Sequence, residues 1–106
     1  MSAADLPGPP TNVRATDVHS KSITISWSAP TKDGGAPIAG YYVERRTGLN
    51  PRWVAVNREP IHILTMLASD LSEGRQYEFR VTAENEVGIG KPSDVIGPLK
   101  AEEPHG

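Results

Sequence analysis

The fold is decided by the stretch RQYEFRVTAEN at residues 75–85, in which apolar and polar side chains alternate without a break. Tyr77, Phe79, Val81 and Ala83 fall on one face of an extended strand, and charged or polar residues fall on the other. Successive side chains of a β-strand point to opposite sides of its sheet. The stretch therefore predicts a strand with one face in a hydrophobic core and the other in water.

A second stretch with the same alternation, KSITISWS, occupies residues 21–28, with Ile23, Ile25 and Trp27 on its apolar face. Similar patterns predict five more strands, at residues 10–18, 38–46, 52–57, 61–69 and 93–100. Connections that bear glycine, proline or asparagine separate the strands at residues 30–37, 47–51, 72–74 and 86–92. No run with helical period reaches ten residues. The sequence therefore predicts an all-β chain folded as a seven-stranded Greek-key β-sandwich of the immunoglobulin-like type.

The core is expected where the apolar faces of these strands meet, together with one leucine from the connection before the long strand. Its predicted members are Trp27, Tyr41, Val43, Leu71, Tyr77, Phe79 and Val81. Pro92 and Pro98 place the last strand at a sheet edge, because proline has no N–H to donate to a neighbouring strand.

The composition fits one globular domain, with 106 residues, 11 Lys plus Arg, 13 Asp plus Glu and no Cys. A formal net charge of −2 lacks the basic surface that nucleic-acid phosphates require, so nucleic acid is not an expected partner. No apolar run approaches 18 residues, so membrane insertion is not expected either. The absence of cysteine is compatible with a reducing cytosol. The polar ends, residues 1–8 and 101–106, are interpreted as linkers around a domain at residues 9–100.

Motifs for catalysis or cofactor binding are incomplete in this sequence. Residues 88–91, GIGK, share part of a phosphate-binding loop, but Asn85 stands at the position of its first glycine and Pro92 at that of its Mg²⁺-binding Ser or Thr. The histidines at positions 19, 62 and 105 have no metal-ligand spacing and are interpreted as surface residues. We therefore expect no catalytic, cofactor-binding or metal-ligating residue, and no cofactor.

One candidate surface for protein contact is the outer face of the sheet formed by the third, fourth, sixth and seventh strands. Acidic and basic side chains alternate there, either as a ladder of exposed ion pairs or as a docking face for a filament protein. In the docking hypothesis, local positive charge comes from Arg45, Arg46, Arg52 and Arg58. Trp53 is either partly buried packing or a binding hot spot.

The second candidate surface is the fifth strand. If Leu64, Met66 and Ala68 face the core, alternation places Ile63 and Leu67 in solvent, unless a β-bulge shifts the register. Exposed large aliphatic side chains are candidates for contact with a neighbouring module or a partner. Both surfaces together give the candidate contact residues Tyr42, Arg46, Arg52, Trp53, Ile63 and Leu67.

The order and content of several segments resemble the fibronectin type III family, over roughly Pro9 to Leu99. The likeness rests on PP at 9–10, SWSAP at 26–30, GGAPIAGYYVERR at 34–46 and LSEGRQYEFRVTAENEVGIGKPS at 71–93. The spacing of Leu71, Gly74 and Tyr77 resembles the tyrosine corner of that family, which implies a phenol that donates a hydrogen bond to buried backbone. The loop at residues 86–91 has no Arg-Gly-Asp, so the family's integrin-binding motif does not carry over.

Within the family, DGGAPIAGYYVERR and RWVAVN are most similar to modules of the giant sarcomeric proteins, the titin, myomesin and myosin-binding protein C group. This implies a non-catalytic spacer, mechanical element and docking surface in a cytoplasmic filament protein. The implied partners are neighbouring immunoglobulin-like or fibronectin type III modules and a filament protein such as myosin.

Two alternatives stay open at this point: an extracellular ectodomain module of a receptor or adhesion protein, and an accessory domain of an enzyme such as a muscle kinase. None of the four asparagines begins an Asn-X-Ser/Thr acceptor, which disfavours the ectodomain.

Overall fold

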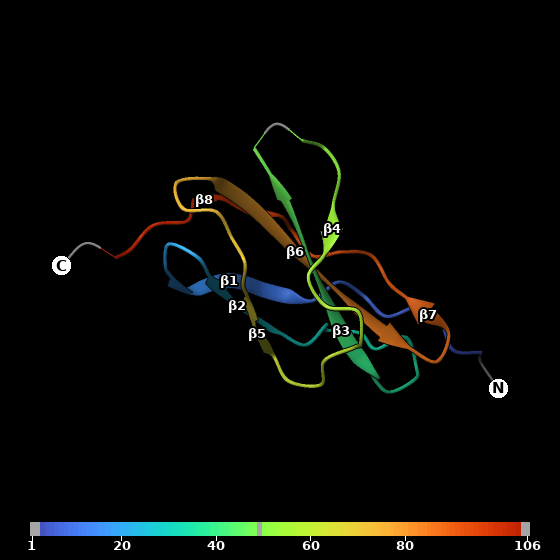
Figure 1. Ribbon diagram of the computed structural model, residues 1–106. Helices are drawn as coiled ribbons and strands as arrows, with labels where there is room; N and C mark the ends of the chain where they lie inside the picture. Colours follow the sequence, from blue (N-terminus) through green and yellow to red (C-terminus); the bar gives the residue numbers. More distant parts are fainter. Residues whose placement is uncertain (1–2, 49, 105–106) are drawn as a thin grey trace.

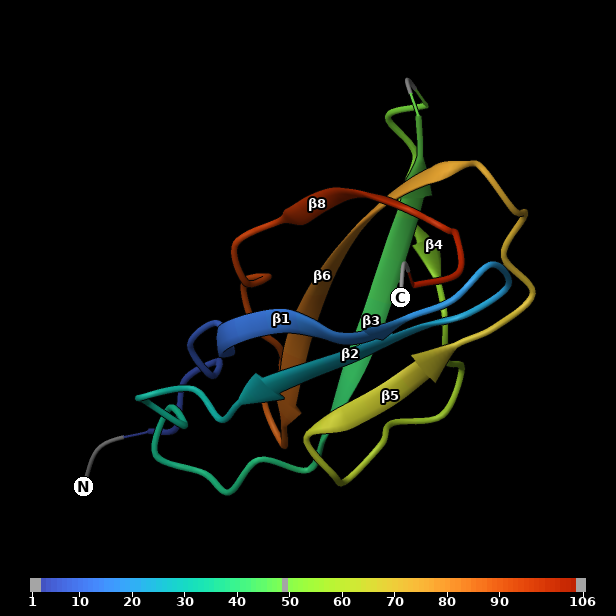
Figure 2. The ribbon, with the colours of Figure 1, turned by 90° about the vertical axis from the view of Figure 1, so that its left-hand side faces the viewer.

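The computed structural model describes residues 3–48 and 50–104, and within them the chain forms two β-sheets packed face to face (Figures 1 and 2). The strands are β1 (Thr11–Val18), β2 (Ile23–Ser28), β3 (Gly40–Thr47), β4 (Val54–Ala55), β5 (Thr65–Ala68), β6 (Gln76–Asn85), β7 (Gly88–Ile89) and β8 (Ile96–Lys100). One sheet has the order β1-β2-β5 and the other β4-β3-β6-β7, with β8 also paired to β6. The predicted all-β sandwich is confirmed. The described part of the chain contains no helix with the length and apolarity needed to cross a membrane.

The core lies between the two sheets, where the inward faces of β2, β3 and β6 meet. The seven residues expected there are all buried, namely Trp27, Tyr41, Val43, Leu71, Tyr77, Phe79 and Val81. Trp27 from one sheet meets Tyr41 from the other edge to face, with ring centroids 5.6 Å apart. This contact joins the layers at the centre of the sandwich.

The described chain has eight strands where seven were predicted, because a short extra strand, β7, precedes the predicted last strand. β7 and β8 pair with opposite ends of β6, and the connection expected at residues 86–92 contains β7. Between them, Val81 N–H donates to the Ser93 hydroxyl (3.0 Å), while Ser93 N–H donates to the Val81 carbonyl (2.8 Å). A side chain replaces the backbone acceptor here, and Pro92 next to it has no N–H, so the regular ladder is interrupted. β8 pairs only with β6 among the described strands, which places Pro98 at a sheet edge as predicted.

The fifth strand is shorter than the predicted segment 61–69. Ile61 forms an isolated antiparallel bridge with Tyr41 of the other sheet, and pairing with β2 starts only at Thr65. The chain therefore crosses from one sheet to the other within this segment, and regular pairing is interrupted between Ile61 and Thr65. The predicted fourth strand at 52–57 is likewise reduced to two residues, because the side chain of Asn57 takes over the bond to β3 that a further strand residue would make.

The segments interpreted as linkers are partly built into the sandwich. Gly8 N–H donates to the Lys32 carbonyl (2.9 Å), and a side chain at Gly90 would collide with the Pro7 carbonyl. Ala101 is fully buried and donates its N–H to the Arg75 carbonyl (2.9 Å). The packed unit is therefore wider than residues 9–100. Residues 1–2, 49 and 105–106, which belong to the expected linkers and to the 47–51 connection, lie outside the described residues.

The described chain enters the sandwich beside β7 and leaves it at the opposite end, past β8 (Figure 1). Its principal extents are 55 × 28 × 21 Å, so the entry and exit lie along an elongated body.

Candidate functional site

The outer face of the larger sheet carries two reciprocal ion pairs. The register between β3 and β6 sets Glu44 opposite Arg80 and Arg46 opposite Glu78. Arg46 Nε donates to Glu78 Oε1 at 2.7 Å, and Arg80 Nε donates to Glu44 Oε1 at 2.8 Å. All four side chains are only 24–30% exposed, so these pairs are more sheltered from water than ordinary surface ion pairs.

Trp53, just before β4, completes this cluster. The guanidinium carbons of Arg46 and Arg80 lie 4.5 and 4.4 Å from the centre of its ring, within the range of cation–π attraction. We call the five residues Glu44, Arg46, Trp53, Glu78 and Arg80 the Trp53 stack. Because both arginines are paired with carboxylates and with the ring, the stack is locally neutral and preorganised.

The four arginines expected to supply positive charge do not form one patch. Arg46 belongs to the neutral stack, whereas Arg45 faces the other side of the sheet, 5.6 Å from the centre of the Tyr77 ring. This is the consequence of strand alternation, since adjacent residues point to opposite faces. Only Arg52 and Arg58 are exposed, and Arg52 N–H donates to Asn50 Oδ1 (3.0 Å) beside the stack. The expectation of a shared basic patch is therefore wrong.

Tyr42 extends the same outer face toward the end of β6. Its hydroxyl donates to Glu84 Oε1 at 3.5 Å, a long hydrogen bond. Partial desolvation, and then the charge of Glu84, raise the pKa of the Tyr42 hydroxyl. The phenol therefore remains neutral near neutral pH and presents a hydrogen-bond donor beside a carboxylate.

Ile63 and Leu67 lie on a separate surface, at the free edge of the β1-β2-β5 sheet. Their exposed fractions are 63% and 54%, as alternation predicts, and the pairing of β2 with β5 has no register shift that would turn Leu67 inward. Leu64 was expected in the core, but it is 42% exposed because it lies where the chain crosses between the sheets. We call Ile63, Leu64 and Leu67 the β5 apolar edge. The six predicted contact residues thus fall on two surfaces.

Tyr77 forms the corner that its spacing suggested, but with the opposite hydrogen-bond direction. Its buried hydroxyl accepts the N–H of Ser72 at 2.7 Å, whereas the resemblance implied a phenol that donates. Nearby, Gly74 N–H donates to the Ala101 carbonyl (2.7 Å), so the corner also holds the segment that follows β8. The corner is a structural element of the exit end.

Asn57 is a structural residue that the sequence pattern did not identify. Its Oδ1 accepts the N–H of Val43 (2.8 Å), and its Nδ2 donates to the carbonyls of Tyr41 (3.0 Å) and Glu59 (2.8 Å). The amide thus fastens the short β4 region to β3. An asparagine, which is disfavoured in strands, at the end of a strand-like segment was the available signal.

Asn85 is a second missed residue, at the entry end. Its Nδ2 donates to the carbonyls of Asp5 (2.7 Å) and Asp33 (2.8 Å), and its Oδ1 accepts the N–H groups of Val87 (2.9 Å) and Gly88 (3.3 Å). One buried side chain therefore joins the incoming segment, the β2–β3 connection and the β6–β7 turn.

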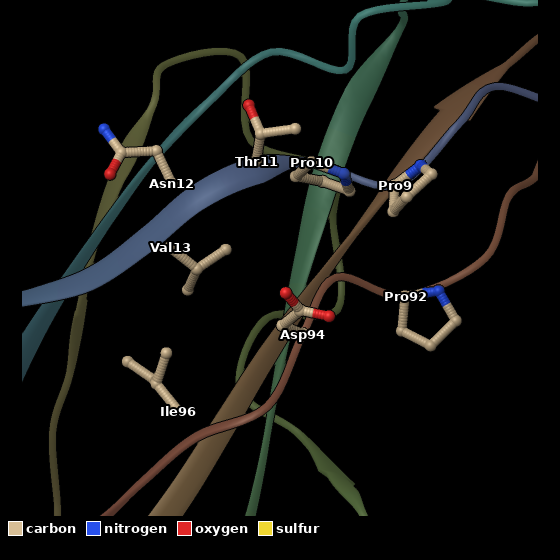
Figure 3. Close-up of a pocket in the computed structure, with 8 residues that line it drawn as sticks. All are labelled: Pro9, Pro10, Thr11, Asn12, Val13, Pro92, Asp94 and Ile96. Atoms are coloured by element: carbon tan, nitrogen blue, oxygen red, sulfur yellow. The ribbon is translucent and has the colours of Figure 1, made fainter.

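A groove lies between the start of β1 and the segment that leads into β8 (Figure 3). Pro9, Pro10 and Pro92 line one end, Val13 and Ile96 the other, and Asp94 lies between them (Figure 3). The lining contains one carboxylate and no base to pair with it, so it offers no general acid–base pair. Within residues 3–48 and 50–104, no three His, Cys, Asp or Glu side chains are arranged to hold a metal ion. His105 lies outside the described residues.

Comparison with known proteins places this sandwich in a family. Residues 8–98 match the sequence model of the Fibronectin type III domain. Titin of Drosophila melanogaster is 45% identical over 87 residues, which make up 82% of this chain and, rounded, 0% of that protein. Myosin-binding protein C, fast-type, of Gallus gallus is 42% identical over 89 residues, 84% of this chain and 8% of that protein.

A crystal structure of domains A168-A170 from titin superposes with a TM-score of 0.89 at 35% identity, covering 94% of this chain and 34% of that one. The chain therefore spans only a small part of each of these relatives. Since the family match covers most of the chain and a titin structure has the same fold, the chain belongs to the fibronectin type III family.

Proposed function

We propose that the chain is a non-catalytic structural and protein-interaction module of a multidomain muscle filament protein, where it acts as spacer, mechanical element and docking surface. The observation that carries this proposal is the 45% identity to titin over four-fifths of the chain. Its neighbours in such a protein would be immunoglobulin-like or fibronectin type III modules, and its location the cytoplasmic sarcomere. The relatives reported above are muscle proteins, so they do not favour the extracellular alternative.

The elongated shape supports the spacer role. Entry and exit lie at opposite ends of the body (Figure 1), so successive modules would follow one another along its length. The segments expected as linkers are partly packed on the sandwich, at Gly8 and Ala101. The contacts of these segments with the sandwich would limit the freedom of neighbouring modules relative to this one.

The docking surface is the outer face around the Trp53 stack, and a filament protein such as myosin is the proposed partner. Trp, Tyr and Arg supply much of the binding energy at typical protein interfaces. This face presents Trp53 and Tyr42, and the exposed Arg52 comes directly before Trp53 in the chain. The stack is already ordered, so a partner would lose little side-chain entropy on binding it. Contacts on an open sheet face are shallow, so one module would bind weakly and an array would bind by avidity.

The test uses the chain coupled densely to beads and incubated with purified striated-muscle myosin filaments. Trp53→Ala and Arg52→Glu should each reduce bound myosin by about tenfold, equivalent to about 1.4 kcal/mol. Arg75→Glu is the matched charge control, because Arg75 is exposed in the β5–β6 connection and is not one of the stack residues. Thermal melts exclude unfolding as the cause.

Unchanged binding in both the Trp53→Ala and the Arg52→Glu variant would contradict docking at this face. Loss of binding only in an Ile63→Ser, Leu67→Ser double variant would move the docking surface to the β5 apolar edge. No binding by the native chain would leave the spacer role and remove myosin as partner.

A further inference from the structure

His19, in the turn between β1 and β2, lies between two carboxylates from different segments. Its Nε2 is 3.0 Å from Asp17 Oδ2 on β1, and its Nδ1 is 3.2 Å from Glu103 Oε1 in the segment after β8. The other oxygen of Glu103, Oε2, accepts the N–H of Ser20 at 2.7 Å. The turn and the exit segment, residues 101–104, lie side by side in both views (Figures 1 and 2). The exit segment is thus fastened to the turn through one carboxylate.

The geometry specifies the protonation state of the ring. An ionised carboxylate can only accept hydrogen bonds, and a neutral imidazole has one N–H, whereas imidazolium has two. Both ring nitrogens of His19 face carboxylate oxygens at hydrogen-bond distance, so both bonds form only when the ring is protonated. In either neutral tautomer, one bond is lost and the other is no longer assisted by a positive charge.

Other charged groups near this turn act less directly on the ring. On the exit segment, Lys100 Nζ lies 3.7 Å from Glu102 Oε2. In the turn itself, the carbonyl of Lys21 accepts the N–H of Leu71. This hydrogen bond brings the connection that contains Asp70 next to the turn. The charges that act on the imidazole are those of Asp17 and Glu103.

We propose that His19, Asp17 and Glu103 form a proton-operated clasp, which fastens the exit segment to the β1–β2 turn when the imidazole is protonated and loosens it when the proton is lost. Ala101 remains held by Arg75 and Gly74 in either state, and the N–H of Ser20 remains a donor to Glu103, so the change affects residues 102–104. In a chain of linked modules, the clasp would make the stiffness of this junction depend on pH. The inference concerns this chain's own residues and stands whether or not the module docks on a filament.

The pKa directions agree with this geometry. Hydrogen bonds to Glu103 and then Asp17 raise the pKa of His19 above 6.5, and hydrogen bonds from Ser20 and His19 lower the pKa of Glu103 from 4.5 to about 2. A raised histidine pKa stabilises the folded state fully below pH 6.5, and this contribution is lost as pH rises through the folded-state value. A lowered carboxyl pKa stabilises it fully above pH 4.5 and is lost as pH falls toward 2. Both contributions to the stability of the folded state are therefore complete between about pH 4.5 and 6.5.

The test is nuclear magnetic resonance of the whole chain between pH 4.5 and 8.5. The heteronuclear NOE of the Glu102 and Glu103 amides should be high at low pH and fall as the pH rises. The midpoint of this fall should coincide with the midpoint of the His19 imidazole titration. In Glu103→Gln the imidazole midpoint should shift to lower pH, because the largest contribution to its raised pKa is removed. In His19→Gln the NOE should lose its pH dependence. His62→Gln is the matched control and should keep it.

An exit segment with the same NOE at pH 5.5 and 8.5 in the native chain would overturn the clasp. So would a pH dependence that persists in His19→Gln, since the proton would then act elsewhere. His19 and Glu103 are both well exposed, so neither variant threatens the fold, and a native-like amide spectrum confirms this for each.

Discussion

The entry end of the sandwich is predicted to depend on Asn85. Its carboxamide makes three hydrogen bonds of 2.7–2.9 Å and a fourth, weaker one of 3.3 Å, all to backbone groups. A hydrogen bond contributes about 0.5–1.5 kcal/mol net, and a buried group left unpaired costs more. Asp5 and Asp33 are exposed, so water can replace part of the loss at their carbonyls. Asn85→Ala should therefore lower the free energy of unfolding by about 2–4 kcal/mol.

The assay is urea denaturation followed by tryptophan fluorescence, with a thermal melt in parallel. In a domain of this size, each kcal/mol corresponds to about 4–8 °C in Tm. Hydrogen exchange gives a local measurement: the N–H of Asp5, which donates to the Gly34 carbonyl (2.7 Å), should lose protection beyond the global change.

Asn85→Asp is the matched variant. It keeps the acceptor for Val87 but turns a carboxylate oxygen toward the carbonyls of Asp5 and Asp33, so at pH 7 it should destabilise at least as much as alanine. An Asn85→Ala variant within 0.5 kcal/mol of the native chain, with Asp5 still protected, would refute the role assigned to this side chain.

Three further substitutions test the core, the corner and the stack. Trp27→Ala removes a buried aromatic and should cost about 3–5 kcal/mol in urea denaturation; a curve that matches the native one contradicts its place in the core. Tyr77→Phe leaves the N–H of Ser72 without its acceptor and should cost about 1–3 kcal/mol, and the Ser72 amide should exchange faster if the corner is as described. Arg46→Glu places two carboxylates together and should cost about 1–3 kcal/mol; Arg46→Glu with Glu78→Arg should recover most of it, and no recovery would exclude direct pairing.

The strands and the core could be predicted because period-2 alternation is a local property of the chain. Residues 75–85 carry the pattern that the structure realises as β6, and Trp27, Tyr77 and Phe79 lie in the core that it implies. Strand ends were harder, because they depend on long-range partners. Ile61 leaves the predicted fifth strand to bridge Tyr41, and Asn57 ends β4 by replacing a backbone bond with a side-chain bond.

The candidate site was predicted less well for the same reason. Arg46 on its own is a positive charge, and only its pairing with Glu78 and its contact with Trp53 make it part of a neutral stack. Asn85 and His19 are single polar residues in sequence, and they acquire roles only when the fold brings distant backbone or carboxylate groups to them.

The same stack helps to specify the pairing of β3 with β6. A slip of one residue would set Val43 and Val81 opposite residues of the outer face, so one of the two strands would lose its place in the apolar core. A slip of two residues keeps every side chain on its own face, so the core alone resists it less. In the observed register Glu44 faces Arg80 and Arg46 faces Glu78. A slip of two in one direction would set Arg46 opposite Arg80, and in the other it would set Glu44 opposite Glu78. Like charges directly opposite one another are destabilising. The apolar face thus excludes a slip of one residue and the charged face disfavours a slip of two, so the stack contributes to a unique fold whether or not a partner docks on it.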